Sequence, residues 1–278
     1  MIKIGLTGWS DHPTIQRSTH KLEDYAMHFP IVEMDTSFYA IPPEKNILSW
    51  METTPDIFQF IPKAYSGMTG HRQGMNEFSS IQEMFDQFKY AFNPLIAQGR
   101  IACFLFQFPP TFECTKASVH YLRQVREWMG ELKVAVEFRH PSWFSEAFKD
   151  KTLEFLEANH FIHVIVDQPQ TPANSVPFIP EVTHSTSTMI RLHGRNYRGW
   201  LGEEVDNWRK ERTLYHYSTD ELTDLAQTVK QQLDAETRDT FIIFNNNSGG
   251  HAAPNAKELK RLLGIEYTHL GPQQTQLF

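Results

Sequence analysis

Eight short runs of apolar residues recur along the chain, and each ends close to a Gly, Pro, Asn or Ser residue. The runs are rich in Val, Ile, Leu and Phe, and this composition between turn residues is typical of β-strands. We therefore predict eight strands, at Ile2–Trp9, Ile31–Phe38, Phe58–Tyr65, Ala102–Pro109, Lys133–Arg139, Ile162–Pro169, Thr188–Gly194 and Thr240–Asn247.

Between most of these runs, apolar residues recur at the spacing of an amphipathic helix. Ser218 and Glu221 form the sequence signature of a capping box, and Gly130 and Gly264 follow two helical patterns as stop signals. The stretch 169–187 instead carries four prolines and no helical period, which predicts an irregular crossover between strands six and seven. The predicted helices are 81–95, 116–129, 219–233 and 254–263, with shorter ones at Pro43–Trp50 and Lys149–Glu157.

This alternation of strands and helices implies a parallel sheet, and eight such units close most simply into a (β/α)8 TIM barrel. A doubly wound open sheet is the alternative fold. We expect residues 1–270 to form a single barrel domain, and residues 271–278 to form a flexible C-terminal tail.

Polar residues occupy alternate positions toward the C-terminal ends of the predicted strands. In a barrel these positions face the interior, and barrel enzymes keep their chemistry at this end. Any one of these groups could be structural, for example as a buried ion pair, but ionised groups are costly to bury unless they are paired or used. The cluster as a whole therefore predicts a functional site. Its members are Thr7, Glu33, Asp35, Ser37, Lys63, Gln107, Glu137, Arg139, Asp167, Arg191, His193, Asn245 and Asn247.

The loops that follow these strand ends add aromatic rings and further cations. Arginine binds carboxylate or phosphate as a fork, and aromatic rings stack on sugars or bases. The run 245–251 precedes a helix, where barrels often bind phosphate, although solvated loops and ordinary helix caps would give similar patterns. The predicted substrate-binding residues are Trp9, Asp35, Tyr39, Gln107, Arg139, His140, Trp143, Asp167, Arg191, Arg195, Asn245, Asn247 and His251.

Charge and composition narrow the classes of protein. With 26 Lys and Arg against 33 Asp and Glu, the net charge is −7, which argues against coating nucleic acid or an anionic membrane. Two cysteines exclude a disulfide scaffold and a four-cysteine zinc site. No apolar run reaches the roughly 18 residues of a membrane helix, and the N-terminus reads as a strand. We expect a cytoplasmic protein without a membrane partner.

No motif in the sequence points to a cofactor. The chain lacks the phosphate loop, the HExxH pair, the dinucleotide GxGxxG and the nucleophile GxSxG, so we predict no cofactor. A divalent metal held by Glu33, Glu137, Asp167 and His193 is possible on ligand type alone. These four residues come from four different strands, so their spacing cannot test the idea.

Eight stretches along the chain carry a resemblance to a known family. They are Gly8–Ser10, Val32–Tyr39, Phe60–Ala64, Gln107–Pro110, Glu137–Phe144, Arg191–Gly194, Phe244–Asn247 and Gly250–Ala252. Together they resemble the YecE/YunF-like family, domain of unknown function 72. The resemblance covers nearly the whole chain and implies a TIM barrel, with no established reaction, cofactor or catalytic residue. Asp35 stands where the family pattern has asparagine, and Asn247 where it has aspartate, which alters the charge of the site.

The first functional hypothesis is an enzyme of the hydrolase or isomerase type that acts on a small anionic substrate, carrying phosphate or carboxylate, or on a sugar. Glu33 and Glu137 would be the acid and the base, because different surroundings can separate the pKa values of two carboxyl groups. Lys63 and His193, with the neighbouring arginines, would bind the anion or stabilise charge in the transition state.

Two alternatives stay open. Gln274, Leu277 and Phe278 match the Q-x-x-L-F peptide with which bacterial repair and replication proteins bind the sliding clamp, so the chain could be a clamp-recruited nucleic-acid-processing protein. The same residues could equally be a frayed end or could pack on the barrel. A non-catalytic ligand-binding barrel is the other alternative.

Overall fold

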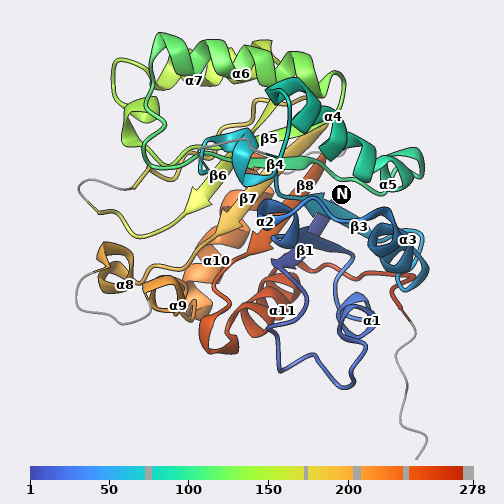
Figure 1. Ribbon diagram of the computed structural model, residues 1–278. Helices are drawn as coiled ribbons and strands as arrows, with labels where there is room; N and C mark the ends of the chain where they lie inside the picture. Colours follow the sequence, from blue (N-terminus) through green and yellow to red (C-terminus); the bar gives the residue numbers. More distant parts are fainter. Residues whose placement is uncertain (73–76, 172–174, 203–207, 234–237, 272–278) are drawn as a thin grey trace, which may run out of the picture.

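The computed structural model describes residues 1–72, 77–171, 175–202, 208–233 and 238–271. Its eight parallel strands form a barrel with helices around it, so the predicted (β/α)8 TIM barrel is confirmed (Figure 1). The strands are β1 (Ile2–Thr7), β2 (Ile31–Met34), β3 (Gln59–Pro62), β4 (Phe104–Gln107), β5 (Val134–Glu137), β6 (Phe161–Asp167), β7 (Ser187–Leu192) and β8 (Asp239–Phe244).

The barrel closes between β3 and β4. The strands follow the order β3-β2-β1-β8-β7-β6-β5-β4. Two isolated parallel bridges, Phe60 with Ile101 and Lys63 with Leu105, join the two ends of this sheet. The Ala64 amide donates to the Leu105 carbonyl at 2.8 Å. This closing seam is short beside the β7–β8 pairing, where six residue pairs lie in register.

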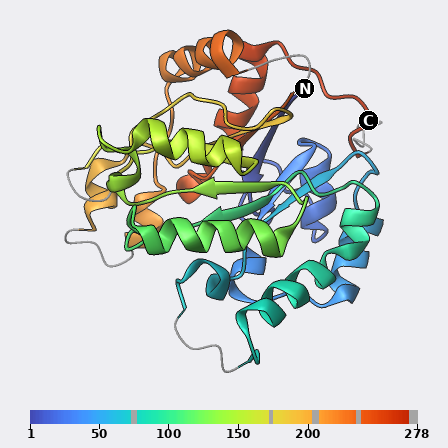
Figure 2. The same cartoon turned by 90° about the horizontal axis from the view of Figure 1, so that it is seen from above.

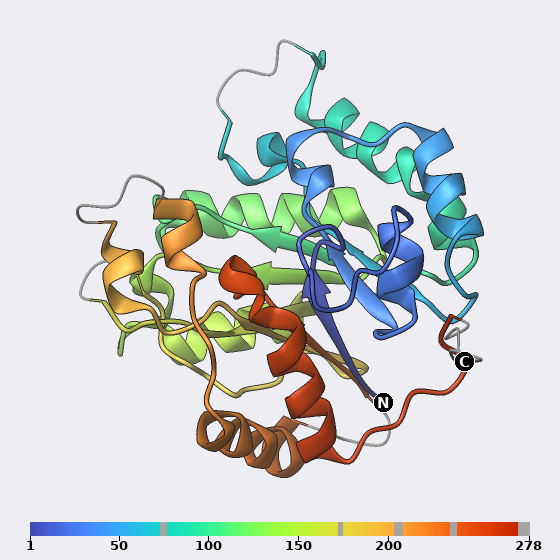
Figure 3. The same ribbon diagram turned by 90° about the horizontal axis from the view of Figure 1, so that it is seen from below.

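Helices surround the barrel, and α10 and α11 pack together on the side of β8 and β1 (Figure 3). None of the helices in the described residues is long and apolar enough to cross a bilayer. The α-helices are α1 (Lys21–Ala26), α2 (Thr36–Tyr39), α3 (Glu44–Glu52), α4 (Ile81–Ala91), α5 (Asn93–Ala97), α6 (Lys116–Met129), α7 (Lys149–Ala158), α8 (Tyr197–Leu201), α9 (Trp208–Arg212), α10 (Thr219–Thr228) and α11 (Ala252–Leu263). The single turns are the 3₁₀ segments η1 (Ser66–Thr69), η2 (Pro141–Phe144) and η4 (Ser248–Gly250), and the π-helical turn η3 (Val229–Leu233).

The helices follow the predicted pattern with local differences. The predicted helix 81–95 is two helices, α4 and α5, because Pro94 in the first turn of α5 has no N–H to continue α4. The capping box before α10 is present: the Glu221 amide donates to Ser218 Oγ at 3.2 Å, and the Ser218 amide donates to the Glu221 carboxylate at 2.9 Å. The short helices α1 and α2 were not predicted.

The predicted irregular crossover lies between β6 and β7. The described residues between these strands contain no helix. Thr183 covers this side of β6: its hydroxyl accepts from the His163 amide at 2.8 Å and donates to the Phe161 carbonyl at 2.7 Å. Extended chain therefore takes the place of a helix on this wall.

Gly5 sets the close approach of β1 to β2. A Cβ atom at this position would lie 2.2 Å from the Ile31 carbonyl oxygen. Only glycine allows the two strands to meet this closely, which brings Thr7 on β1 level with Glu33 on β2.

Candidate active site

Arg191 lies at the centre of a buried ionic cluster inside the barrel. It projects from β7 and binds Glu33 of β2 with two parallel hydrogen bonds, from Nε at 2.8 Å and from Nη2 at 2.6 Å. Its Nη1 binds Glu137 at the end of β5, and also donates to Gln107 at the end of β4 at 3.2 Å. One guanidinium thus connects four strands of the barrel, β7, β2, β4 and β5, because strand alternation turns all of these polar side chains toward the interior.

A second cation and a histidine bind the other oxygen of Glu137. Arg139 Nη2 lies 2.6 Å from Glu137 Oε1, and His193 Nε2 lies 3.2 Å from the same oxygen. The Asn245 amide nitrogen lies 2.8 Å from His193 Nδ1. Arg139 Nη2 lies 3.1 Å from His193 Nε2, so this ring nitrogen faces a donor as well as the Glu137 carboxylate, and the tautomer sets which of the two contacts is a hydrogen bond.

The rim above this cluster carries a less buried cation. Lys63, directly after β3, lies 3.3 Å from Asp35 and stands over the Phe38 ring at 4.8 Å. Its side chain is 13% exposed, whereas those of Glu33 and Glu137 are fully buried. Lys63 is therefore the cation of this group that solvent and a ligand reach first.

A separate network surrounds Asp167 at the end of β6. The Arg195 Nε lies 3.0 Å from both Asp167 oxygens, and the Tyr217 hydroxyl donates to Asp167 at 2.6 Å. Arg195 also binds Glu221 at 3.0 Å, which ties this network to the start of α10. Gly194, at φ +83°, turns the chain so that His193 joins the central cluster and Arg195 joins this one.

The surroundings give the two central carboxyl groups different pKa values. Burial raises the pKa of Glu33 to about 7, although the Arg191 charge opposes this. Burial acts in the same direction on Glu137, but Arg139, Arg191 and His193 together hold its pKa well below its usual value. Burial and the Arg139 charge lower the pKa of His193 well below its usual value. Near neutral pH, Glu33 can thus exchange a proton while Glu137 stays ionised and His193 stays neutral.

Some buried polar atoms at this end of the barrel lack a hydrogen-bond partner among the described residues. They include Thr7 Oγ1 beside Glu33, Asn247 Oδ1 after β8, and Arg139 Nε. The Asn247 amide nitrogen donates to the Thr7 carbonyl at 2.8 Å, so the first two residues are in contact. Buried polar atoms are nearly always satisfied, so these atoms offer hydrogen bonds to a bound molecule or water.

The predicted site residues divide into those that the structure gathers and those that lie apart. The central cluster holds Glu33, Gln107, Glu137, Arg139, Arg191, His193 and Asn245, with Lys63 and Asp35 above it. Asp167 and Arg195 form the adjacent network, and Asn247 contacts Thr7.

The remaining predicted residues contact other groups. Trp9 packs edge-on against Trp50 at 5.3 Å, and Tyr39 is 64% exposed. His140 caps η2 through Ser142, and the His251 ring lies 5.2 Å from that of His216. Trp143 stacks on Phe138 at 4.0 Å, and its indole donates to the Phe112 carbonyl. The tail residues Gln274, Leu277 and Phe278 lie outside the described residues.

The four residues suggested as metal ligands do not assemble. Glu33 and Glu137 both bind Arg191, while Asp167 binds Arg195 and Tyr217. In the described part of the chain, no three His, Cys, Asp or Glu side chains gather as a metal ion would require. The donor set therefore fits an arginine-centred cluster better than a metal centre.

Two contributors to the site were not predicted from the sequence. Gln168 accepts from Arg139 Nη1 at 3.3 Å, and Tyr217 binds Asp167. Tyr217 comes from the long connection between β7 and β8, where strand alternation gives no guide. Gln168 directly follows a predicted interior residue, which was the available signal. Trp200, one of the aromatic residues expected in the loops beyond the strand ends, has its ring 5.3 Å from the Arg139 guanidinium.

Comparisons with known proteins agree with this fold. A family profile described as "Protein of unknown function DUF72" matches residues 3–277. The UPF0759 protein YunF of Bacillus subtilis is 47% identical and covers all of both chains, and YecE of Escherichia coli K12 is 28% identical over 79% of this chain and 84% of its own. A crystal structure of a DUF72 family protein from Enterococcus faecalis superposes with a TM-score of 0.92 at 42% identity, covering 99% of this chain and 100% of that one. One from Thermotoga maritima gives 0.81 at 31%, covering 95% and 100%.

Proposed function

This chain belongs to the DUF72 family, and we propose that it is an enzyme of the isomerase or hydrolase type. Its substrate is a small anion, carrying phosphate or carboxylate and possessing sugar-like hydroxyl groups, which binds at the C-terminal mouth of the barrel. The observation that carries this proposal is the pair of carboxyl groups on Arg191, whose pKa values are shifted in opposite directions.

Glu33 is the proposed acid–base group. A group transfers protons best when its pKa lies near the working pH, and burial brings the pKa of Glu33 to about 7. Glu137 has the opposite character, because a carboxyl group with a strongly lowered pKa is a poor base at neutral pH. Its part is to remain charged and to hold Arg191, Arg139 and His193 in place.

Lys63 is the proposed anchor for the substrate anion. Arg191 already makes four hydrogen bonds to protein side chains, which occupy most of its N–H groups, so it positions Glu33 instead of binding substrate. Lys63 is more exposed and has only Asp35 as its ion-pair partner among the described residues. The free oxygens of Thr7 and Asn247 beside Glu33 are suited to substrate hydroxyl groups.

The separation of the two carboxyl groups keeps glycoside hydrolysis among the compatible reactions. Both groups contact one guanidinium, which keeps their separation below the upper limit of roughly 9.5 Å that glycosidases use. Proton transfer between neighbouring carbons of a sugar phosphate or sugar acid needs only one acid–base group, and it fits Glu33 more directly.

The test is turnover of a panel of sugar phosphates and sugar acids by the full-length protein, followed by NMR. We expect Glu33→Gln to lower kcat by about 10² to 10⁴-fold with little change in substrate affinity, because the side-chain shape persists and the amide oxygen still accepts one of the two Arg191 hydrogen bonds. Lys63→Met should mainly raise KM, and Lys45→Met, at an exposed position on α3, should change neither value. Tight binding of a panel member without turnover would instead identify a ligand-binding barrel.

The sequence at the C-terminus favours a second role, recruitment to the sliding clamp. Gln274, Leu277 and Phe278 match the docking peptide. We expect the full-length chain to bind purified clamp in a calorimetric titration, and the double variant Leu277→Ala/Phe278→Ala to lose that binding through the missing apolar contacts. Equal binding by the two proteins would contradict this role.

A further inference from the structure

A groove on the outside of the barrel lies between α6 and α7, away from the ionic cluster. The two helices overlap in Figure 1 and run roughly parallel in Figure 2, and residues of both line the groove. The groove has a volume of about 570 Å³, within the range of roughly 300 to 1,000 Å³ typical of small-molecule sites. Its lining is Cys114, Thr115, Lys116, Val119, Arg123, Trp143, Phe148, Lys151, Thr152 and Phe155.

The groove is lined mainly by apolar and aromatic side chains. Phe148 is 40% exposed at its edge, and Trp143 is buried beneath it. Trp143 is held in place by its stack on Phe138 at 4.0 Å and by its hydrogen bond to the Phe112 carbonyl at 2.7 Å. Because Trp143 is fully buried, it supports the groove from below, and the apolar surface open to a ligand is that of Val119, Phe148 and Phe155.

Three cations surround this apolar lining. Lys116, Arg123 and Lys151 are exposed, and none of them forms an ion pair or donates a hydrogen bond to another described residue. Arg123 and Lys151 instead lie over the rings of Phe155 and Phe148, at 5.7 and 6.0 Å. The lining contains no acidic residue. In a chain with a net charge of −7, a groove with three unpaired cations is complementary to an anion.

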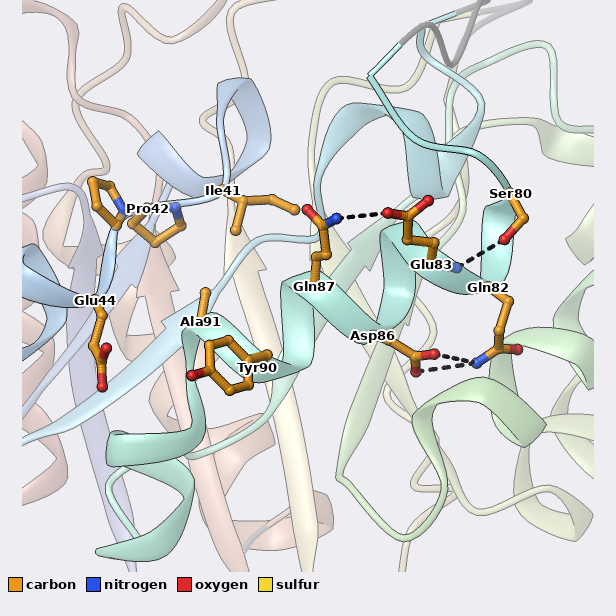
Figure 4. A pocket seen from close by; sticks show the side chains of 11 residues that line it. Ile41, Pro42, Glu44, Ser80, Gln82, Glu83, Asp86, Gln87, Tyr90 and Ala91 are labelled. Atoms are coloured by element: carbon orange, nitrogen blue, oxygen red, sulfur yellow. Dashed lines mark hydrogen bonds between the residues drawn. The ribbon is translucent and has the colours of Figure 1, made fainter.

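A second hollow provides a contrast. The hollow between α3 and α4 has three carboxylates, Glu44, Glu83 and Asp86, but two of them already have protein partners (Figure 4). Glu83 accepts from Ser79 and Gln87, and Asp86 pairs with Lys89 at 3.1 Å. Among the described residues that line that hollow, Glu44 is the single charge without a partner, whereas the α6–α7 groove has three such charges.

We propose that the α6–α7 groove binds a small aryl carboxylate. The aromatic body lies on Val119, Phe148 and Phe155 above Trp143, and the carboxylate contacts Lys116, Arg123 and Lys151. The apolar lining is suited to the aromatic ring, and the cations without ion-pair partners are suited to the carboxylate.

The test compares two probes of the same shape by calorimetry on the full-length protein. 2-Naphthoate carries the carboxylate, and 2-naphthamide is its neutral counterpart. We expect the acid to bind at least tenfold more tightly, and added salt to reduce this difference. The triple variant Lys116→Met/Arg123→Met/Lys151→Met keeps apolar side chains and should bind the acid at least tenfold more weakly, with amide binding unchanged. Lys45→Met is the matched control and should bind both probes like the wild type.

A second readout locates the ligand. Cys114 lines the groove and is partly exposed, whereas Cys103 is buried, so alkylation by iodoacetamide reports on Cys114. Naphthoate should slow this alkylation in the wild type and leave it unchanged in the triple variant. Failure of the wild type to bind naphthoate, equal binding by the triple variant, or unprotected Cys114 each overturns the proposal. So does a wild-type dimer in sedimentation that the triple variant lacks, because a second copy would then cover the groove.

Discussion

Arg191 shows how a single residue decides the state of two others. Its guanidinium lies between two fully buried carboxyl groups, and removal of one partner from such a group leaves an uncompensated charge. Glu137 has Arg139 and His193 in addition, whereas the Arg191 guanidinium is the one cation that contacts Glu33 among the described residues. The additional charge of Arg139, with the neighbouring His193, explains why the pKa of Glu137 falls, whereas burial raises that of Glu33.

The pKa of Glu33 predicts a particular dependence of stability on pH. Its carboxyl group titrates near 4.5 when unfolded and near 7 when folded. Between these values the folded state holds a proton that the unfolded state has lost, so the free energy of unfolding falls as pH rises. We expect Glu33 to account for a loss of about 3 kcal/mol across this window.

Urea unfolding of the wild type and Glu33→Gln at several pH values checks this expectation. From pH 4.5 to pH 7, the wild type should lose about 3 kcal/mol of unfolding free energy relative to Glu33→Gln. Glu137 acts in the opposite direction, since its lowered pKa adds stability that is lost only as pH falls below this window. A difference that is flat over the window would refute the raised pKa.

At the scale of elements, the turn after β7 separates the two ionic networks. Gly194 has φ +83°, and a Cβ atom there would lie 2.5 Å from Tyr215 Cβ. Gly194→Ala should therefore lower the free energy of unfolding by about 3 kcal/mol, from backbone strain and overpacking together.

Gly99→Ala is the matched control for this substitution. Gly99 also has positive φ, at +65°, but nothing lies within 4 Å of a Cβ there, so we expect a loss of only about 1 kcal/mol. Equal losses for the two variants in urea unfolding would show that the contact with Tyr215 carries no cost.

The elements also show where sequence reasoning succeeds. Strand alternation placed Glu33, Glu137, Arg191 and His193 on one interior surface, because a period of two depends only on local geometry. It could not find Tyr217, whose hydroxyl reaches Asp167 from 50 positions away. The helical spacing of the apolar residues continues across Pro94, so this spacing predicted one helix where the structure has α4 and α5. The proline itself was the sequence signal for the break. Side-chain partners set by the packing of long loops have no comparable local signal.

At the scale of the whole molecule, the barrel is bonded unevenly around its circumference. The seam between β3 and β4 has two isolated bridges, whereas β7 and β8 pair over six residues. Local opening should follow this difference, since protection of an amide depends on the structure that must open around it.

Hydrogen exchange under native conditions tests the uneven bonding. We expect the amides of Ala64 and Ala102, which donate across the seam, to exchange at least tenfold faster than the bonded amides within β7 and β8. Equal protection around the barrel would show that the seam opens only when the whole domain unfolds.

The position of Arg191 has a mechanical consequence for this seam. In the barrel, β2 is the neighbour of β3 and β5 is the neighbour of β4, so β2 and β5 lie on either side of the β3–β4 seam. Arg191, on β7 across the barrel, forms ion pairs with Glu33 of β2 and Glu137 of β5. It therefore links the two strands beside the seam, where hydrogen bonding between strands is weakest, so the buried charged groups of the candidate site also help to hold the barrel closed.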